Sequence, residues 1–216
     1  MNFLDCVLNF IFPPVCGICL KISGKYICEE CMELIKFKSL NKIDTYNNKN
    51  FKEHLYIFKY EGIIRQRILD YKFREKSYLH SSFSEMILNS KENIEFIKKY
   101  DVLIPIPIHK DRMRTRGYNQ SELIAKDLVY EIKNIKLENR VLIKTKNIIA
   151  QSSLNKKQRE NNIKDVYQIK SAEKVMNKKV LLLDDIYTTG STVNECAKIL
   201  KEAGCIEVGI ITIAKD

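Results

Sequence analysis

Two adjacent carboxylates followed by a hydroxyl-rich turn form the part of this 216-residue sequence that is best suited to chemistry. Asp184 and Asp185 follow the apolar run at residues 180–183, which is typical of a buried strand. Open α/β sheets bind ligands at the carboxyl ends of their strands. The turn at residues 188–192 offers hydroxyls and backbone N–H groups just before a predicted helix, and this combination favours a bound phosphate dianion.

The paired acids narrow the choice of ligand. Two carboxylates repel a bare phosphate, so the ligand should also carry a diol or a metal ion that the carboxylates can engage. A ribose phosphate meets both demands. An ordinary strand and helix-capping turn would account for Gly190 and Ser191 but would leave the two aspartates unexplained. The sequence has neither Gly-x-Gly-x-x-Gly nor Gly-x-x-x-x-Gly-Lys-Ser/Thr, which argues against dinucleotide binding and P-loop NTP hydrolysis.

A second group with chemical potential consists of four of the seven cysteines, arranged as two Cys-x-x-Cys pairs with eight residues between them. The four are Cys16, Cys19, Cys28 and Cys31. Two such pairs can surround Zn²⁺ with a tetrahedron of sulfur, which leaves no open position for a substrate water, so a structural zinc site is predicted. Disulfides are the competing interpretation, and they are disfavoured in a chain without a secretion signal. The other three cysteines are expected to be small buried hydrophobic residues: Cys6, Cys196 and Cys205.

Strand-like and helical segments alternate along the chain and predict an α/β fold with a mainly parallel, twisted sheet. We expect a small metal module at residues 1–40, a linker at 41–50 without apolar periodicity, and a main domain at 51–216. Strands are predicted at 54–60, 102–108, 141–143, 166–169, 180–183 and 206–213. Helices are predicted from 63 to the basic residues near 72–74, as one element over 81–100, around 124–132, and over 192–203.

The composition bears on location and partners. No apolar run approaches the roughly 20 residues that span a bilayer, so no transmembrane segment is expected. Asp5 and an early Pro-Pro pair are unlike a signal peptide, which favours the cytoplasm. The 37 basic residues outnumber the 27 acidic ones, for a net charge of +10. This excess favours anionic partners such as nucleic acid or phosphorylated metabolites, although an ordinary Lys-rich surface would give the same value.

Residues 180–192 resemble the 5-phosphoribosyl-1-pyrophosphate (PRPP) signature of type I phosphoribosyltransferases, and the wider pattern resembles the ComF family. The further segments that match are Phe12-Pro-Pro-Val-Cys-Gly-Ile-Cys19 with Cys28 and Cys31, Ile104-Pro-Ile-Pro-Ile-His109, Arg116-Gly-Tyr-Asn-Gln120, and Gln151-Ser-Ser-Leu with Arg159 and Asn162. Members of this family are competence proteins implicated in bringing single-stranded transforming DNA into the bacterial cytoplasm. They combine a four-cysteine zinc module with a phosphoribosyltransferase-like domain, which the resemblance assigns to residues 51–216.

The resemblance implies roles for individual residues. Asp184 and Asp185 would hold the ribose hydroxyls of PRPP, which binds with Mg²⁺, and the turn would surround the 5-phosphate. The residues expected to bind PRPP are Asp184, Asp185, Tyr187, Thr188, Thr189, Gly190, Ser191, Thr192, Lys72, Arg74, Arg112 and Arg116. Each of the four cations among them has a competing interpretation as a solvated surface charge. Asp184, Asp185 and Arg159 are the expected catalytic residues, the last from a polar stretch at 146–164 that matches the family's closing loop.

Three functions stay open at this point. The first is a DNA-uptake protein that binds PRPP, in which Tyr118 and the aromatic residues near Lys72 stack on unpaired bases. The second is a metabolic phosphoribosyltransferase, for which no segment identifies the amine or base that accepts the sugar. The third is a zinc-dependent module that docks on a helicase or another uptake protein. His109 is expected to order its loop by a hydrogen bond rather than to act in catalysis.

Overall fold

The computed structural model describes residues 13–147 and 166–216 of the chain. Its main sheet has six strands in the order β1-β2-β8-β7-β3-β4. The strands are β1 (Lys42–Thr45), β2 (Glu53–Lys59), β3 (Val102–Pro105), β4 (Lys136–Leu137), β7 (Lys179–Tyr187) and β8 (Glu207–Lys215). Only the β1–β2 pairing is antiparallel in this sheet, and the other four are parallel. The predicted α/β class with a mainly parallel sheet is confirmed.

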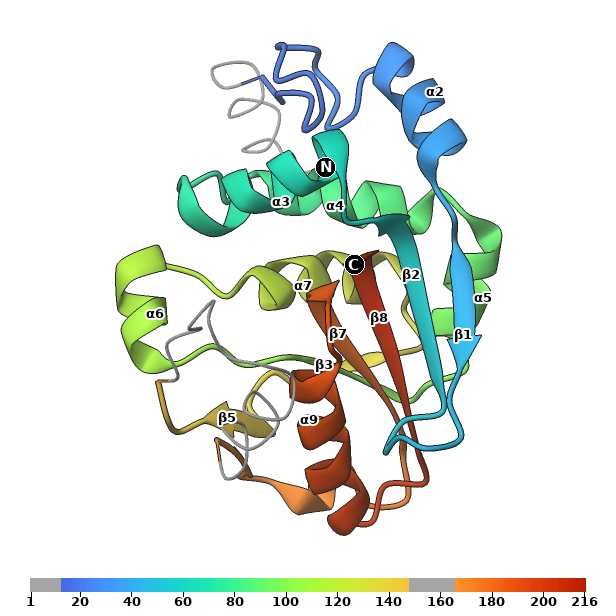
Figure 1. Cartoon of the computed structure of the whole chain (residues 1–216), viewed down its shortest axis with the longest axis vertical. Coiled ribbons are helices and arrows are strands. Elements are labelled where there is room, and N and C mark those ends of the chain that lie inside the picture. Colours follow the sequence, from blue (N-terminus) through green and yellow to red (C-terminus); the bar gives the residue numbers. More distant parts are fainter. Residues whose placement is uncertain (1–12, 148–165) are drawn as a thin grey trace.

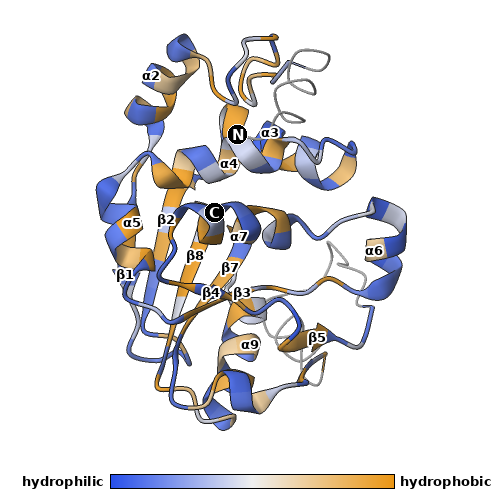
Figure 2. Cartoon of the chain, turned by 180° about the vertical axis from the view of Figure 1, so that it is seen from behind, coloured by the Kyte–Doolittle hydropathy of each residue, from blue (hydrophilic) through white to orange (hydrophobic). Residues whose placement is uncertain are grey.

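Helices cover both faces of this sheet. The helices of the described residues are α2 (Glu29–Lys38), α3 (Gly62–Phe73), α4 (Leu79–Leu88), α5 (Lys91–Ile97), α6 (Lys110–Arg116), α7 (Gln120–Glu131) and α9 (Ser191–Glu202), with a 3-10 turn at Ala172–Lys174. In Figure 1, α9 lies in front of the strands and α7 behind them, and α3 and α4 lie beyond the ends of β2 and β8. The apolar colour of the central strands in Figure 2 marks the core between these layers.

Alternation along β7 explains why both faces are apolar. Leu181 and Leu183 belong to the core cluster that includes α7, whereas Val180 and Leu182 belong to the cluster that includes α9. Successive side chains of a strand point to opposite faces, so a continuous apolar run fills two cores at once. The strand continues through the two aspartates to Tyr187, which places the acids at its carboxyl end.

The predicted helix over residues 81–100 is wrong, because the structure has two helices there. α4 ends at Leu88 and α5 begins at Lys91. Ser90 lies between them in an extended conformation, and its side chain accepts a hydrogen bond from the backbone N–H of Asn93. This N-cap starts a new helix in the middle of a stretch whose apolar spacing had suggested a single one.

The strand predictions need three adjustments. The expected linker at 41–50 contains β1, an edge strand that pairs with β2. β3 ends at Pro105 rather than at residue 108, although the N–H of Ile106 still donates to the Leu183 carbonyl oxygen on β7. The strands expected near 141 and 166 are β5 (Leu142–Lys144) and β6 (Tyr167–Ile169), and they form a separate antiparallel pair outside the main sheet.

The cysteine-bearing segment packs against the main body rather than standing apart from it. Ile18, Ile27 and Ile35 share one core cluster with residues of β2, α3 and α4. Leu40, which follows α2, donates its backbone N–H to the carbonyl oxygen of Ile57 on β2. Across the described residues, no helix combines the length and apolar character needed to cross a membrane.

Candidate functional site

The two aspartates lie at the carboxyl end of β7 and are held in different ways. The Asp185 carboxylate is buried and lies 2.8 Å from the Nζ of Lys72, which comes from the last turn of α3. The carboxylate of Asp184 accepts the backbone N–H of Asp185 at 2.9 Å. Burial and the neighbouring charge of Asp185 raise the pKa of Asp184 to about 7, although Lys72 acts in the opposite direction. The pair therefore combines a charge-compensated acid with one that can exchange a proton near neutral pH.

The turn after β7 has the geometry expected of an anion-binding loop. Gly190 adopts a left-handed conformation with φ at +73° and forms the N-cap of α9. The hydroxyls of Thr189 and Ser191 lie 2.8 Å apart. Residues 188–192 line a small cavity together with Asp184, Ile186, Tyr187 and Val193. The first N–H groups of α9 have no partners within the helix, so this cavity offers donors beside two hydroxyls.

The Tyr187 side chain packs against the turn at Gly190. Its ring is mostly buried, stacks on His54 with 4.4 Å between ring centroids, and contacts Phe51 and Tyr46. A Cβ added to Gly190 would lie 2.2 Å from the Tyr187 hydroxyl. Position 190 therefore requires glycine for two reasons: its backbone is left-handed, and a Cβ there would collide with the Tyr187 ring.

We expect Gly190→Ala to lower the free energy of unfolding by about 2–3 kcal/mol, because it adds left-handed strain and displaces a packed ring. Chemical denaturation measures this loss. Gly62→Ala is the matched control: Gly62 also has a positive φ, but open space surrounds its Cβ position, so about 1 kcal/mol of strain is expected alone. Equal losses in the two variants would show that the Tyr187 contact is not constraining.

A cationic cleft of about 420 Å³ lies beside the acid pair. It is lined by Lys72, Phe73, Glu75, Asp111, Arg112, Thr115, Arg116 and Asn147. Helix α6, which carries Arg112 and Arg116, is capped by His109, whose Nδ1 accepts the backbone N–H of Asp111 at 3.2 Å. The expected loop-ordering hydrogen bond of His109 is thus present. Figure 1 shows α6 and the end of α3 on the same side of the molecule.

Of the four predicted cations, the structure brings three to this cleft. Lys72, Arg112 and Arg116 line it, and the Arg116 guanidinium lies over the Phe73 ring at 5.5 Å from its centroid. Burial lowers the pKa of Arg116, and the charge of Asp185 opposes that shift. Arg74 instead pairs with Asp70 at 3.0 Å, and its side chain is 67% exposed. It does not line the cleft.

Sequence reasoning missed Lys144, at the end of β5. Burial and the charge of Arg112 lower the pKa of this lysine, while the charge of Asp184 raises it. Its Nζ lies over the Tyr167 ring at 5.4 Å from the centroid. In sequence, Lys144 is one of several lysines in a polar stretch, and only the folding of the β5–β6 pair against α9 places it near the acids.

Arg159 and most of the stretch at 146–164 lie outside the described residues, as does Cys6. The expected roles of Arg159 and of the closing loop therefore remain predictions. The other two unpaired cysteines, Cys196 and Cys205, are buried among core residues, as expected. Among the described residues, six cysteines are free of disulfides.

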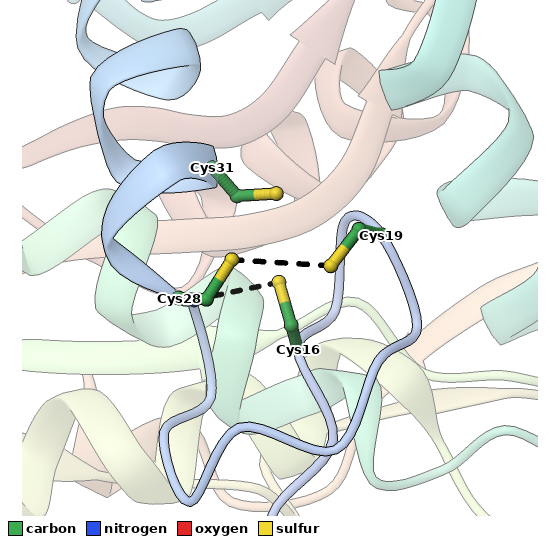
Figure 3. A group of neighbouring side chains, drawn as sticks. All are labelled: Cys16, Cys19, Cys28 and Cys31. Atoms are coloured by element: carbon green, nitrogen blue, oxygen red, sulfur yellow. Dashed lines mark hydrogen bonds between the residues drawn. The ribbon is translucent and has the colours of Figure 1, made fainter.

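The four cysteines of the two Cys-x-x-Cys pairs converge on one point. All their sulfur atoms lie within 4.8 Å of one another, and the Sγ atoms of Cys19 and Cys28 are 3.9 Å apart. A zinc–sulfur bond of about 2.3 Å in a tetrahedron requires sulfurs about 3.8 Å apart, so the arrangement fits Zn²⁺. Figure 3 shows the four side chains pointing toward one another from the loop and from the start of α2.

Backbone N–H groups favour the thiolate form of Cys16, one of the four candidate ligands. Burial alone would hinder ionisation of Cys16, but backbone N–H groups of Cys28, Cys19 and Ile18 outweigh it and lower the pKa of the Cys16 thiol to about 7. The Cys28 N–H lies 3.4 Å from the Cys16 sulfur. Thiolates are the form that binds zinc, so N–H groups aimed at sulfur favour the metal-bound state.

Comparison with known proteins extends these observations. Residues 120–216 match the family model described as a phosphoribosyl transferase domain. Competence protein ComFC of Streptococcus pneumoniae is 31% identical over 162 residues, which cover 75% of this chain and 68% of that protein. Competence protein F of Haemophilus influenzae is 24% identical over 208 residues, or 94% of this chain and 85% of that protein. The solved adenine phosphoribosyltransferase of Thermoanaerobacter pseudethanolicus covers 86% of this chain and 99% of its own, with 16% identity and a TM-score of 0.42.

Proposed function

The chain belongs to the ComF family of competence proteins, and from this premise we propose that it binds PRPP with Mg²⁺ and acts in the uptake of single-stranded transforming DNA. One observation carries the proposal: the acid pair, the hydroxyl-rich turn and the cationic cleft meet at the carboxyl end of β7. A ligand that satisfies all three must carry a diol, a phosphate monoester and a further anionic group. PRPP has each of these groups.

The roles in the pocket follow from the chemistry of its side chains. Asp184 and Asp185 accept hydrogen bonds from the two ribose hydroxyls, and the turn at 188–192 donates to the 5-phosphate. Lys72, Arg112 and Arg116 face the pyrophosphate, whose oxygens suit guanidinium forks. Carboxylate and phosphate oxygens are the ligands that Mg²⁺ prefers, so the acid pair and the pyrophosphate would hold it, where it supplies charge neutralisation.

The DNA part of the proposal depends on charge and on one exposed ring. The net charge of +10 favours a polyanion. Tyr71 is fully buried, and the Tyr118 ring stacks on it with 5.6 Å between centroids while its hydroxyl donates to the Tyr71 carbonyl, so neither ring offers a free face to a base. The stacking role expected for aromatic residues near Lys72 therefore falls to Phe73, which is 69% exposed at the mouth of the cationic cleft. A base could stack on the ring while its phosphates meet the arginines.

We expect single-stranded oligonucleotides to bind with an affinity that falls steeply as salt is raised, because phosphate contacts release counterions. Phe73→Ala should weaken this binding about tenfold, since one base–aromatic stack contributes roughly 1–3 kcal/mol. Fluorescence anisotropy across a salt series measures both effects. Tyr130→Ala is the matched control, because Tyr130 is also an exposed aromatic residue, at 78%, but does not line the cleft. Absent or salt-independent binding would remove DNA from the proposal.

A further inference from the structure

A buried arginine joins the metal-binding segment to the helix that reaches the acid pair. Arg67 lies in the middle of α3, is 7% exposed, and donates its Nε–H to the carbonyl oxygen of Ile18 at 2.9 Å. Ile18 is part of the Cys16–Cys19 pair, between two of the four sulfur ligands. The same guanidinium contacts Asp70 at 2.7 Å through its NH1 atom. One side chain thus bridges the metal-binding loop and the last turns of α3.

Asp70 is a buried carboxylate that several cations near the end of α3 share. Its carboxylate is 1% exposed, and besides Arg67 it contacts Arg74 at 3.0 Å and Lys76 at 3.5 Å. Burying an ion pair costs desolvation free energy, and apolar residues of similar size often stabilise a protein as well or better. A buried pair with a donor aimed at a neighbouring loop is better explained as a device that fixes geometry than as a source of stability.

The geometry that it fixes is that of Lys72. Lys72 lies two residues after Asp70 on the same helix, and its Nζ contacts the Asp185 carboxylate. The sequence of contacts therefore runs from the Ile18 carbonyl through Arg67 and Asp70 to the helical turn that carries Lys72, and on to the candidate ribose site.

A second set of contacts packs the metal-binding loop closely against α4. A Cβ at Gly17 would lie 2.2 Å from the Ser82 hydroxyl oxygen on α4. The backbone N–H of Gly17 and the hydroxyl of Ser82 both donate to the carbonyl oxygen of Tyr26, each at 2.8 Å. The loop between Cys16 and Cys19 thus contacts α3 through the Arg67 side chain and α4 through the Ser82 side chain, and the close packing at Gly17 leaves little space for adjustment.

We infer that Arg67 is a positioning residue that couples metal binding by the four cysteines to ligand binding at Asp185. When the cysteines hold zinc, the Ile18 carbonyl is fixed, Arg67 and Asp70 are oriented, and Lys72 is held at the acid pair. When the cysteines hold no zinc, the end of α3 becomes more mobile, and Lys72 is no longer held in place at the acid pair. The inference rests on the proposed function, because it takes PRPP as the ligand of the pocket.

Coupling between two sites is reciprocal, and this provides the test. In the full chain loaded with zinc, saturating PRPP with Mg²⁺ should raise the zinc affinity about tenfold in equilibrium competition with a chromophoric chelator, and removal of zinc should weaken PRPP binding about tenfold in calorimetry. Arg67→Met keeps the apolar stem and should make each affinity independent of the other ligand. Arg67→Lys restores a charged donor without the fork and should retain part of the coupling. Arg65→Met, an exposed arginine on the same helix, should leave the coupling intact.

Each result has a defined meaning. If PRPP binds the zinc-loaded protein but does not alter its zinc affinity, or if Arg67→Met keeps the full coupling, the inference is wrong. If PRPP does not bind at all, the proposed function fails, and hydrogen exchange then decides the inference. Chelation should speed amide exchange at residues 68–73 of the wild-type protein, and unchanged exchange there would overturn it. The wild-type measurements also decide the matter should Arg67→Met fail to fold.

Discussion

Replacement of both acids, as Asp184→Asn with Asp185→Asn, should weaken binding of PRPP with Mg²⁺ by at least about 100-fold. Each carboxylate would lose a hydrogen bond between a charged group and a ribose hydroxyl, and such bonds contribute roughly 1.5–3 kcal/mol apiece. Calorimetric titration measures the loss. The variant should keep its fold, because the asparagines preserve volume and the repulsion removed between the two acids offsets the lost pairing of Asp185 with Lys72. Glu92→Gln, outside the candidate site, is the control.

The pH dependence of the same titration carries a second signature. Since burial and Asp185 raise the pKa of Asp184 to about 7, the free protein at pH 6 holds a proton that a hydroxyl donor or a metal ion must displace. Affinity should therefore rise from pH 6 to pH 8, and Asp184→Asn should abolish most of that rise. The linkage has the opposite sign for folding: the native state holds this proton more tightly than the unfolded chain, so Asp184 contributes stability that is fully present below about pH 4 and is lost progressively as the pH rises to about 7. If the double variant Asp184→Asn with Asp185→Asn binds PRPP as tightly as the wild-type protein does, the assignment of the ribose site is contradicted.

Loss of the metal should have the second largest effect. Cys16→Ser removes one of four converging sulfurs, and we expect the protein to lose its zinc and its melting temperature to fall by about 10–20 °C. Structural zinc contributes up to roughly 10 kcal/mol of apparent folding free energy in small modules, and about 5 kcal/mol corresponds to a shift of this size for a chain of this length. The shared core of Ile18, Ile27 and Ile35 with the main body explains why the effect should not stay local.

Metal analysis and differential scanning fluorimetry measure these changes. Cys205→Ser is the matched control, because Cys205 is also buried and free but lies far from the cluster in the sequence and outside it in the structure. Its zinc content should stay at one ion per chain. Zinc content unchanged in Cys16→Ser, or a disulfide detected among the four cysteines, would contradict the metal site.

The parts of the fold that local sequence determines were predictable. Part of β7 was visible as the apolar run at residues 180–183, and the Gly190 turn with its hydroxyls follows a few residues later, so both the strand and the binding turn are indicated within thirteen residues. The four cysteines were equally clear, because spacing alone defines the metal pattern. Each of these depends on neighbouring residues in the chain, where periodicity and turn chemistry act most directly.

Features that depend on tertiary contacts were not predictable. The N-cap at Ser90 splits a helix whose apolar spacing continues across the break, and β1 forms from a polar segment because β2 offers an edge to pair with. The difference between Lys72 and Arg74 has the same origin. Both lie at the end of α3, but the Lys72 Nζ contacts the Asp185 carboxylate, whereas the Arg74 guanidinium pairs with Asp70. No sequence pattern separates two cations so close together, because partners from distant segments decide the outcome.

We propose that the carboxyl end of β7 binds PRPP through the acid pair and the turn that follows it. A crystal structure of the protein with PRPP and Mg²⁺ tests this most directly. We expect the two ribose hydroxyls within hydrogen-bond distance of the Asp184 and Asp185 carboxylates and the 5-phosphate among residues 188–192. An empty cleft at saturating ligand, or PRPP bound elsewhere with both carboxylates turned away from it, would contradict the account.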